Sequence, residues 1–281
     1  MTGIFTLPQV VSSGLTTEGT AWSAFGNNSS RYAPIVLIHG VGMQQAYWAP
    51  QVNALQQEFL VITYDMWGHG QTPANPAATH LPDFTAQLIA LLTELNIDRA
   101  HVVGHSMGGL VALDFGIHHP DRAASITVLN SVFDRTEEQR APVLRRAHDL
   151  ADHGVMKIDQ TLERWFGTPQ DTLYPEAEAL SRRLLESVNP AGYANAYMVF
   201  ATADDAQNDT LSALEVKATF ATGDGDPNST PEMSETMARI APHGTCVVLR
   251  DQRHMMSLTA PQTVTDIIRQ TVLKADSGGH Q

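Results

Sequence analysis

Short runs of apolar, mostly β-branched residues alternate along the chain with stretches that are apolar at helical spacing. The short runs predict strands buried on both faces, and the longer stretches predict helices. One stripe, which predicts a long amphipathic helix, consists of Leu81, Phe84, Leu88, Leu91, Leu92 and Leu95. Residues 9–26 predict two antiparallel strands, and six further strands are predicted at 34–38, 59–64, 100–103, 124–129, 216–221 and 245–249. We therefore expect an α/β fold with a mostly parallel eight-stranded sheet and helices on both faces.

The alternation stops at about residue 131 and returns at Val216. Between these points the chain has no strand pattern. Its pieces are amphipathic and rich in Arg and Glu, and they predict helices at 136–154, 158–165, 176–188 and 192–203. We interpret residues 1–130 and 211–281 as one core, and residues 131–210 as an inserted helical cap, or lid, over one edge of the sheet.

Composition and charge indicate which classes of binding partner the chain is suited to. The chain of 281 residues has a net charge of −13 and no long basic run, which argues against nucleic acid and anionic membrane surfaces. The single cysteine, Cys246, excludes an internal disulfide. No stretch approaches the ~20 apolar residues of a membrane span, and residues 1–8 lack the features of an export signal. We expect a cytoplasmic protein, a monomer or a homodimer, that acts on a small molecule.

A G-x-S-x-G pattern, Gly104-His105-Ser106-Met107-Gly108, lies between a predicted strand and a predicted helix. Such a turn is so tight that glycines must flank it, and it places Ser106 at its tip in a strained conformation. The pattern alone is common by chance, but the strand before it and the helix after it make it specific. The backbone N–H of Met107 begins the helix, where developing negative charge is favoured.

A serine needs a base to activate it, and the base needs an acid to orient it. His254 follows the last predicted strand and returns to the sheet edge that holds Ser106. Asp226 follows the preceding strand, whereas Asp224 is better placed to form the turn. Asn130 follows an earlier strand but cannot carry the required charge. Four other histidines are less suited, and we expect His105 to point away from the tip: His69, His105, His118 and His119.

The order Ser106, Asp226, His254, together with His39-Gly40 and the 65–70 segment, resembles enzymes of the α/β-hydrolase fold along the whole chain. The nearest-looking branch is that of 3-oxoadipate enol-lactonases and related small-molecule esterases and lactonases. The resemblance implies that the N–H groups of Val41 and Met107 form the oxyanion hole. One departure is Trp67, where the family commonly has arginine before Gly-His-Gly.

These residues indicate a serine hydrolase of a small carboxylic ester or lactone. Carbon–carbon bond hydrolysis of a diketone-type acid and amide hydrolysis are alternatives on the same scaffold, and a non-catalytic receptor for a small ligand is a further one. A haloalkane dehalogenase is disfavoured, because its nucleophile is a carboxylate and here the position is Ser106. No metal and no organic cofactor are implied, since the three side chains suffice for the chemistry.

The sequence says least about the substrate pocket. We expect it to be lined by apolar residues of the cap and of the loops near the triad: Trp48, Trp165, Phe166, Tyr197 and Met255. Arg135 and Arg164 could pair with a substrate carboxylate, but an exposed surface position is the favoured interpretation for both.

Overall fold

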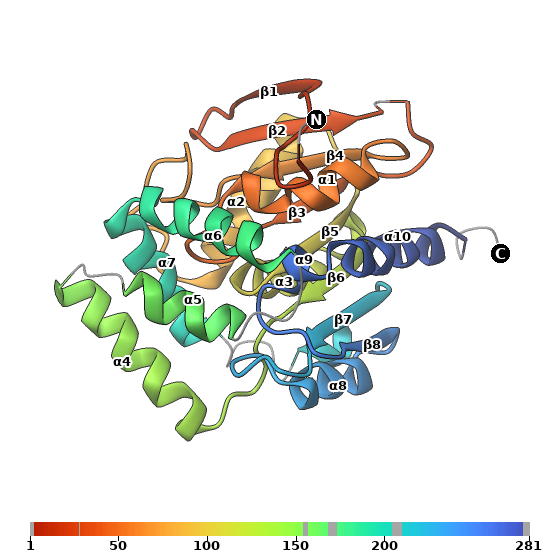
Figure 1. Ribbon diagram of the computed structural model, residues 1–281. Helices are drawn as coiled ribbons and strands as arrows, with labels where there is room; N and C mark the ends of the chain where they lie inside the picture. The colour runs from red at the N-terminus through yellow and green to blue at the C-terminus, as the bar shows by residue number, and fades with distance from the viewer. Residues whose placement is uncertain (1–2, 28, 154–156, 168–172, 204–209, 278–281) are drawn as a thin grey trace.

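The computed structural model describes residues 3–27, 29–153, 157–167, 173–203 and 210–277. Its centre is one eight-stranded sheet with the order β1-β2-β4-β3-β5-β6-β7-β8 (Figure 1). The strands are β1 (Ser12–Leu15), β2 (Ala21–Gly26), β3 (Ile35–Ile38), β4 (Leu60–Tyr64), β5 (Ala100–His105), β6 (Ala123–Leu129), β7 (Ala218–Gly223) and β8 (Gly244–Leu249). β2 runs antiparallel to β1 and β4, and all the other pairs are parallel. The predicted fold class is confirmed.

Helices cover both faces of this sheet. On one face α1 (Ala49–Leu55) packs against α10 (Pro261–Ser277), and on the other α2 (Leu81–Glu94) packs against α3 (Met107–His118). The remaining core helix, α8 (Pro231–Ile240), lies against β7 and β8. Four short elements of the described chain were not predicted: 3₁₀ turns at Gln45–Trp48, Pro120–Arg122 and Leu211–Ala213, and the helix α9 (Met256–Thr259) after the last strand.

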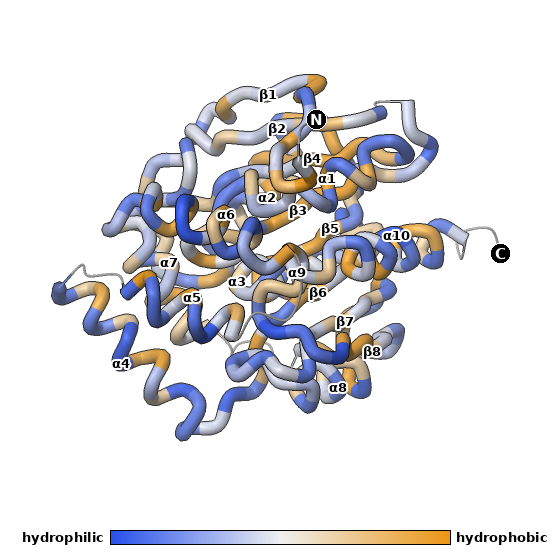
Figure 2. Tube along the Cα trace, in the orientation of Figure 1, coloured by the Kyte–Doolittle hydropathy of each residue, from blue (hydrophilic) through white to orange (hydrophobic). Residues whose placement is uncertain are grey.

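The apolar runs fill the middle of the molecule, as Figure 2 shows for the central strands. All four residues of β3 and all six of β5 are buried, because strands between two helical layers have no solvated face. None of the described helices is long and apolar enough to cross a membrane.

Between β6 and β7 the described chain forms helices and no strand. These are α4 (Glu137–His153), α5 (Ile158–Phe166), α6 (Tyr174–Ser187) and α7 (Pro190–Thr202), which gather at one side of the molecule (Figure 1). α4 packs on α7, α5 packs on α6, and α6 also contacts α9. A Cβ atom on Gly68 would collide with the backbone of Gly192, so the α7 backbone lies directly on a core loop. The cap boundaries 131–210 stay a prediction.

Candidate active site

Ser106 lies at the tip of the β5–α3 turn in a left-handed conformation, with φ 56° and ψ −119°. A side chain at Gly104 would collide with the Gly108 carbonyl, so the close approach of strand and helix requires glycine there. The Ser106 N–H donates to the carbonyl of Leu129 at 2.8 Å, and the Ser131 hydroxyl donates to the Ser106 carbonyl at 2.9 Å. The end of β6 and the loop directly after it therefore hold both backbone groups of the strained residue.

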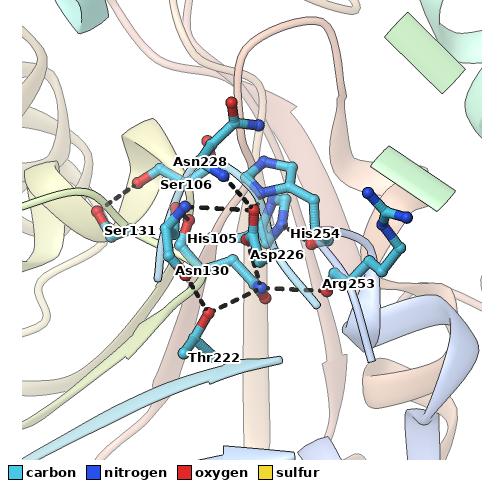
Figure 3. A network of polar contacts seen from close by, with 10 residues as sticks. His105, Ser106, Asn130, Ser131, Thr222, Asp226, Asn228, Arg253 and His254 are labelled. Atoms are coloured by element: carbon cyan, nitrogen blue, oxygen red, sulfur yellow. Dashed lines mark hydrogen bonds and ion pairs between the residues drawn. The ribbon is translucent and has the colours of Figure 1, made fainter. Parts of the chain in front are cut away.

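Asp226 and His254 are paired beside this turn (Figure 3). The Oδ2 atom of Asp226 lies 2.8 Å from Nδ1 of His254, and both side chains are buried. Asp224, the competing acid, instead accepts a hydrogen bond from the backbone N–H of Asp251 at 2.8 Å, which joins the loop after β7 to the loop after β8.

Further donors surround the Asp226 carboxylate. Asn130 donates its side-chain amide to Oδ2 at 2.9 Å, and the backbone N–H groups of Asn228 and Ser229 donate to Oδ1 at 2.9 and 3.2 Å. Burial alone would raise the pKa of this carboxyl, but the nearby His254 and these donors outweigh it, so the pKa of Asp226 lies below its ordinary value. An ionised Asp226 only accepts, so Nδ1 of His254 carries the proton and Nε2 is left as the basic atom.

The His105 side chain contacts His254. Its ring lies 4.9 Å from the His254 ring, and its Nε2 lies 2.8 Å from the His254 carbonyl oxygen. A carbonyl only accepts, so Nε2 of His105 donates. Burial and the neighbouring His254 lower the pKa of His105 to about 3, which keeps it neutral. Its side chain therefore helps to position the loop that carries His254.

Two further histidines tie the loop after β3 to the loop after β4. The Gly42 N–H donates to Nε2 of His69 at 2.9 Å, and the Met66 N–H donates to Nε2 of His39 at 3.0 Å. Burial lowers the pKa of His39 to about 4 and the pKa of His69 to about 3, so both rings stay neutral and can accept. Each loop thus donates one hydrogen bond to a histidine of the other loop, and the two bonds together fix the loop that contains Val41.

Val41 and Met107 are the two residues expected to offer backbone N–H groups near Ser106. Val41 lines the cavity that contains Ser106 and His254. Met107 is the first residue of α3, so its N–H has no partner within the helix. In the part of the chain that the structure describes, neither N–H has a hydrogen-bond acceptor. Two such donors can stabilise an oxyanion that forms beside the serine.

The cavity over Ser106 is small, about 270 Å³, against the ~300–1,000 Å³ of typical small-molecule sites. The core contributes Val41, Ser106, His254 and neighbouring loop residues, and α4, α5 and α7 contribute the opposite wall. The Trp165 ring stacks 5.9 Å from the His254 ring. Such a space suits a small organic molecule held against aromatic side chains.

The predicted pocket residues divide into two groups. Trp165 and Tyr197 line the cavity that contains Ser106. Trp48, Phe166 and Met255 do not: Trp48 is fully enclosed in the core, Met255 is 1% exposed, and Phe166 packs edge-on against Tyr174. These three were wrong because their apolar character serves packing, and sequence alone does not separate packing from lining.

The surface interpretation of two arginines was also wrong. Both Arg135 and Arg164 line the cavity. Arg135 is only 4% exposed and donates to the backbone carbonyls of Phe200 and Ala201 at 3.0 and 3.1 Å. Its burial depends on the last turn of α7, more than sixty residues further along the chain, so no local pattern predicts it.

Sequence reasoning missed the roles of His39, His69, His105 and Asn130. A signal for the first two was present, since His39 comes directly after a strand and His69 lies in the loop after the next one, each beside glycine. Neither motif, however, predicts which backbone N–H group will donate a hydrogen bond to the histidine ring. Within the described residues, no group of three or more His, Cys, Asp or Glu side chains is placed to hold a metal ion.

The sheet, the strained serine turn and the buried carboxylate–histidine pair define the class of protein: an α/β enzyme whose candidate site lies at the carboxyl ends of parallel strands. Residues 33–261 match the model of the alpha/beta hydrolase fold family. The chain belongs to this family.

Its relatives are named hydrolases, and the chain is a hydrolase. It is 41% identical over 236 residues to an (E)-2-((N-methylformamido)methylene)succinate hydrolase from Acinetobacter baylyi, covering 84% of this chain and 89% of the relative. It is 32% identical to 3-oxoadipate enol-lactonase 1 from the same organism, over 89% and 92% of the two chains. The crystal structure of the enol-lactonase from Burkholderia xenovorans superposes with a TM-score of 0.83 at 25% identity, over 93% of this chain and 100% of the other.

Proposed function

We propose that the chain hydrolyses a small carboxylic ester or lactone through an acyl-enzyme on Ser106. The observation that carries this proposal is the buried Asp226–His254 pair, which shares one small cavity with the strained Ser106 turn. A serine, a base and an orienting acid in this relation are the parts that acyl transfer requires. Helices α4–α7 act as the cap that limits the size of the substrate.

The first half of the reaction forms the acyl-enzyme. Nε2 of His254 takes the proton of the Ser106 hydroxyl while Oγ attacks the carbonyl carbon. The carbonyl oxygen becomes an oxyanion between the N–H groups of Val41 and Met107, and each donor of this kind lowers a barrier by roughly 2.7–4 kcal/mol. Asp226 stays ionised and stabilises the protonated ring. His254 then gives its proton to the leaving oxygen, and the bond from that oxygen to the acyl carbon breaks.

The second half releases the acid. A water molecule gives its proton to Nε2 of His254, and its oxygen attacks the acyl carbon. As the tetrahedral intermediate collapses, the bond from Ser106 Oγ to the acyl carbon breaks, His254 returns the proton to Oγ, and a carboxylic acid is released. In a lactone the leaving oxygen remains attached to the acyl chain, so the product is a single hydroxy or enol acid.

A second candidate is hydrolysis of an amide-type carbon–nitrogen bond. The relative that is 41% identical is named for an N-methylformamido compound, and the same three side chains could act on a nitrogen leaving group. Carbon–carbon hydrolysis has no comparable support among the relatives described above. The receptor alternative is not retained, because the relatives are named hydrolases.

Treatment with a fluorophosphonate, followed by intact mass and peptide mapping, tests the proposed function. We expect a single adduct on Ser106, absent in Ser106→Ala and slowed at least about 100-fold in His254→Ala. An unmodified Ser106 in protein that is folded by circular dichroism would contradict the proposal. Esters, lactones and N-methylformamides of matched size then separate the two candidates by their kcat/KM values.

A further inference from the structure

The cap wall of the Ser106 cavity carries positive charge that no acid in the cavity balances. Arg135, Arg146 and Arg164 all line it. No Asp or Glu is among the described residues that line the cavity, although the whole chain has a net charge of −13. Cations gathered in a partly buried, largely aromatic site repel one another, so an arrangement of this kind indicates an anionic ligand.

Arg164 is the cation best placed to receive that ligand. It lies on α5 next to Trp165, the residue whose ring stacks on His254. The structure gives its guanidinium no hydrogen bond and no ion pair among the described residues. Burial and the nearby Arg146 lower the pKa of Arg164, but the side chain remains charged. Asp226 cannot neutralise it by contact, because its oxygens already accept from four donors.

The other two arginines are held by the protein. Arg146 donates to the Tyr197 hydroxyl oxygen at 2.7 Å, which leaves the tyrosine O–H free to donate into the cavity. Arg135 is fixed by its bonds to the α7 carbonyls and lies over the Phe200 ring. Both add positive potential to the wall, while Arg164 keeps its planar fork of donors available.

The positive charge continues outward from the catalytic cavity. A second cavity of about 450 Å³ between α4 and α5 shares Arg146, Arg164 and Tyr193 with the first. Its described lining adds Arg145 and Lys157, against one acid, Asp149. A basic approach of this kind raises the local concentration of an anion and steers it toward the narrower site.

We propose that the substrate carries a carboxylate besides the bond that is cleaved, and that Arg164 binds this carboxylate with help from Arg146 and the Tyr197 hydroxyl. A carboxylate fits better than a larger anion, because the guanidinium fork matches its two oxygens and the cavity is small. The inference deepens the proposed function and rests on it for the identity of the cleaved bond. Arg164 is then a specificity-determining residue at the opposite wall from Ser106.

Binding to a variant that cannot turn over tests the inference apart from hydrolysis. In Ser106→Ala protein, calorimetry is run with monomethyl glutarate and with the neutral methyl pentanoate. We expect measurable binding of the glutarate, weakened about 10- to 100-fold by adding Arg164→Met and largely retained with Arg164→Lys, which keeps the charge. Arg182→Met is the matched control, since Arg182 pairs with Asp159 and Glu178 outside the cavity. No preference for the glutarate over the pentanoate, or equal binding with Arg164→Met, would overturn the inference.

Turnover separates this inference from the proposed function. The 4-nitrophenyl monoester of glutarate and 4-nitrophenyl pentanoate are hydrolysed by the Ser106-containing enzyme. We expect the ratio of the two kcat/KM values to favour the glutarate at least about tenfold, to decrease with added salt, and to approach 1 in Arg164→Met. Ser106-dependent hydrolysis with a ratio near 1 would leave the proposed function standing and remove the carboxylate site. Arg164-dependent binding of the glutarate without any hydrolysis would support the carboxylate site and contradict the proposed function.

Discussion

The two walls of the active-site cavity are built differently. On the core wall, the groups next to the reacting atoms are fixed by hydrogen bonds to neighbouring strands and loops, and the three supporting histidines are neutral. On the cap wall, long arginine and aromatic side chains face the same space, and the charge of Arg164 has no bonded partner among the described residues.

The difference separates two tasks. Chemistry requires atoms held to within fractions of an ångström, which a buried sheet edge with satisfied polar groups provides. Selection requires a surface that can vary in size and charge, which side chains on an inserted set of helices provide. Changes in the core wall should therefore affect kcat or folding, whereas changes in the cap wall should affect KM and the choice of substrate.

The largest effect is expected at the acid. Asp226→Asn keeps the size of the side chain but removes the charge that fixes the His254 tautomer, so kcat should decrease about 1,000- to 10,000-fold. Steady-state hydrolysis of a 4-nitrophenyl ester measures it. Asp224→Asn is the matched control and should lose less than about threefold, because Asp224 only accepts from the Asp251 N–H. Equal losses in both variants would remove Asp226 from the proposed mechanism.

The serine turn should tolerate no added side chain. In Gly104→Ala the new methyl group would collide with the Gly108 carbonyl, so the free energy of unfolding should decrease by at least about 3 kcal/mol. Urea denaturation measures it. Gly14→Ala meets only ordinary contacts with the Trp22 ring and serves as the control. A Gly104→Ala protein of normal stability would mean that the turn is looser than described.

Low pH should decrease the free energy of unfolding, because four buried histidines must stay neutral in the folded protein. Burial lowers the pKa of four histidines, to about 4 for His39 and His101 and about 3 for His69 and His105. Between about pH 6.5 and 4 the unfolded chain binds protons there that the folded chain does not, so stability decreases as pH falls, by up to about 1.4 kcal/mol per pH unit for each histidine. Burial raises the pKa of Asp65, so this carboxyl favours the folded state as pH falls. It opposes the effect of the histidines, but it is a single group and they are four. Urea midpoints measured from pH 7 to 4.5 should fall steadily; a constant midpoint would contradict the neutral assignment.

The hydrogen bond from the Gly42 N–H to His69 should stabilise the transition state more than it strengthens substrate binding. His69→Ala removes the acceptor of the Gly42 N–H next to Val41, so kcat should decrease about tenfold while KM changes little. His69→Gln can restore an acceptor and should recover part of the loss. His243→Ala, at an exposed position, is the control. An increase in KM with unchanged kcat would place His69 in substrate binding instead.

The smallest effect is expected on the cap wall. Tyr197→Phe removes the hydroxyl that accepts from Arg146, so KM for an anionic ester should rise about two- to fivefold with kcat unchanged. The same kinetic assay measures it, with Tyr32→Phe, remote from the cavity lining, as the control. A loss confined to kcat would contradict the division of tasks between the two walls.

The sequence predicted the two walls unequally well. Strands and helices of the core follow from local periodicity, and the loops after parallel strands meet at one edge by topology, which is why Ser106, Asp226 and His254 could be placed together. The short helix α9 was missed, because four residues carry no periodic signal.

Side-chain environments could not be predicted from local pattern. Trp48 and Arg135 owe their burial to residues far away in the chain, so an aromatic expected in the pocket lies in the core and an arginine expected at the surface lies in the cavity. The roles of His39 and His69 likewise depend on two loops coming together.

The central claim is that Ser106 becomes acylated during turnover. Rapid acid quenching with a slowly deacylated 4-nitrophenyl ester, followed by peptide mass mapping, tests it most directly. We predict an acyl mass on the peptide that contains Ser106, formed at the rate of the nitrophenol burst and absent in Ser106→Ala. Undiminished hydrolysis by folded Ser106→Ala, or an acyl group on a different residue, would contradict the account.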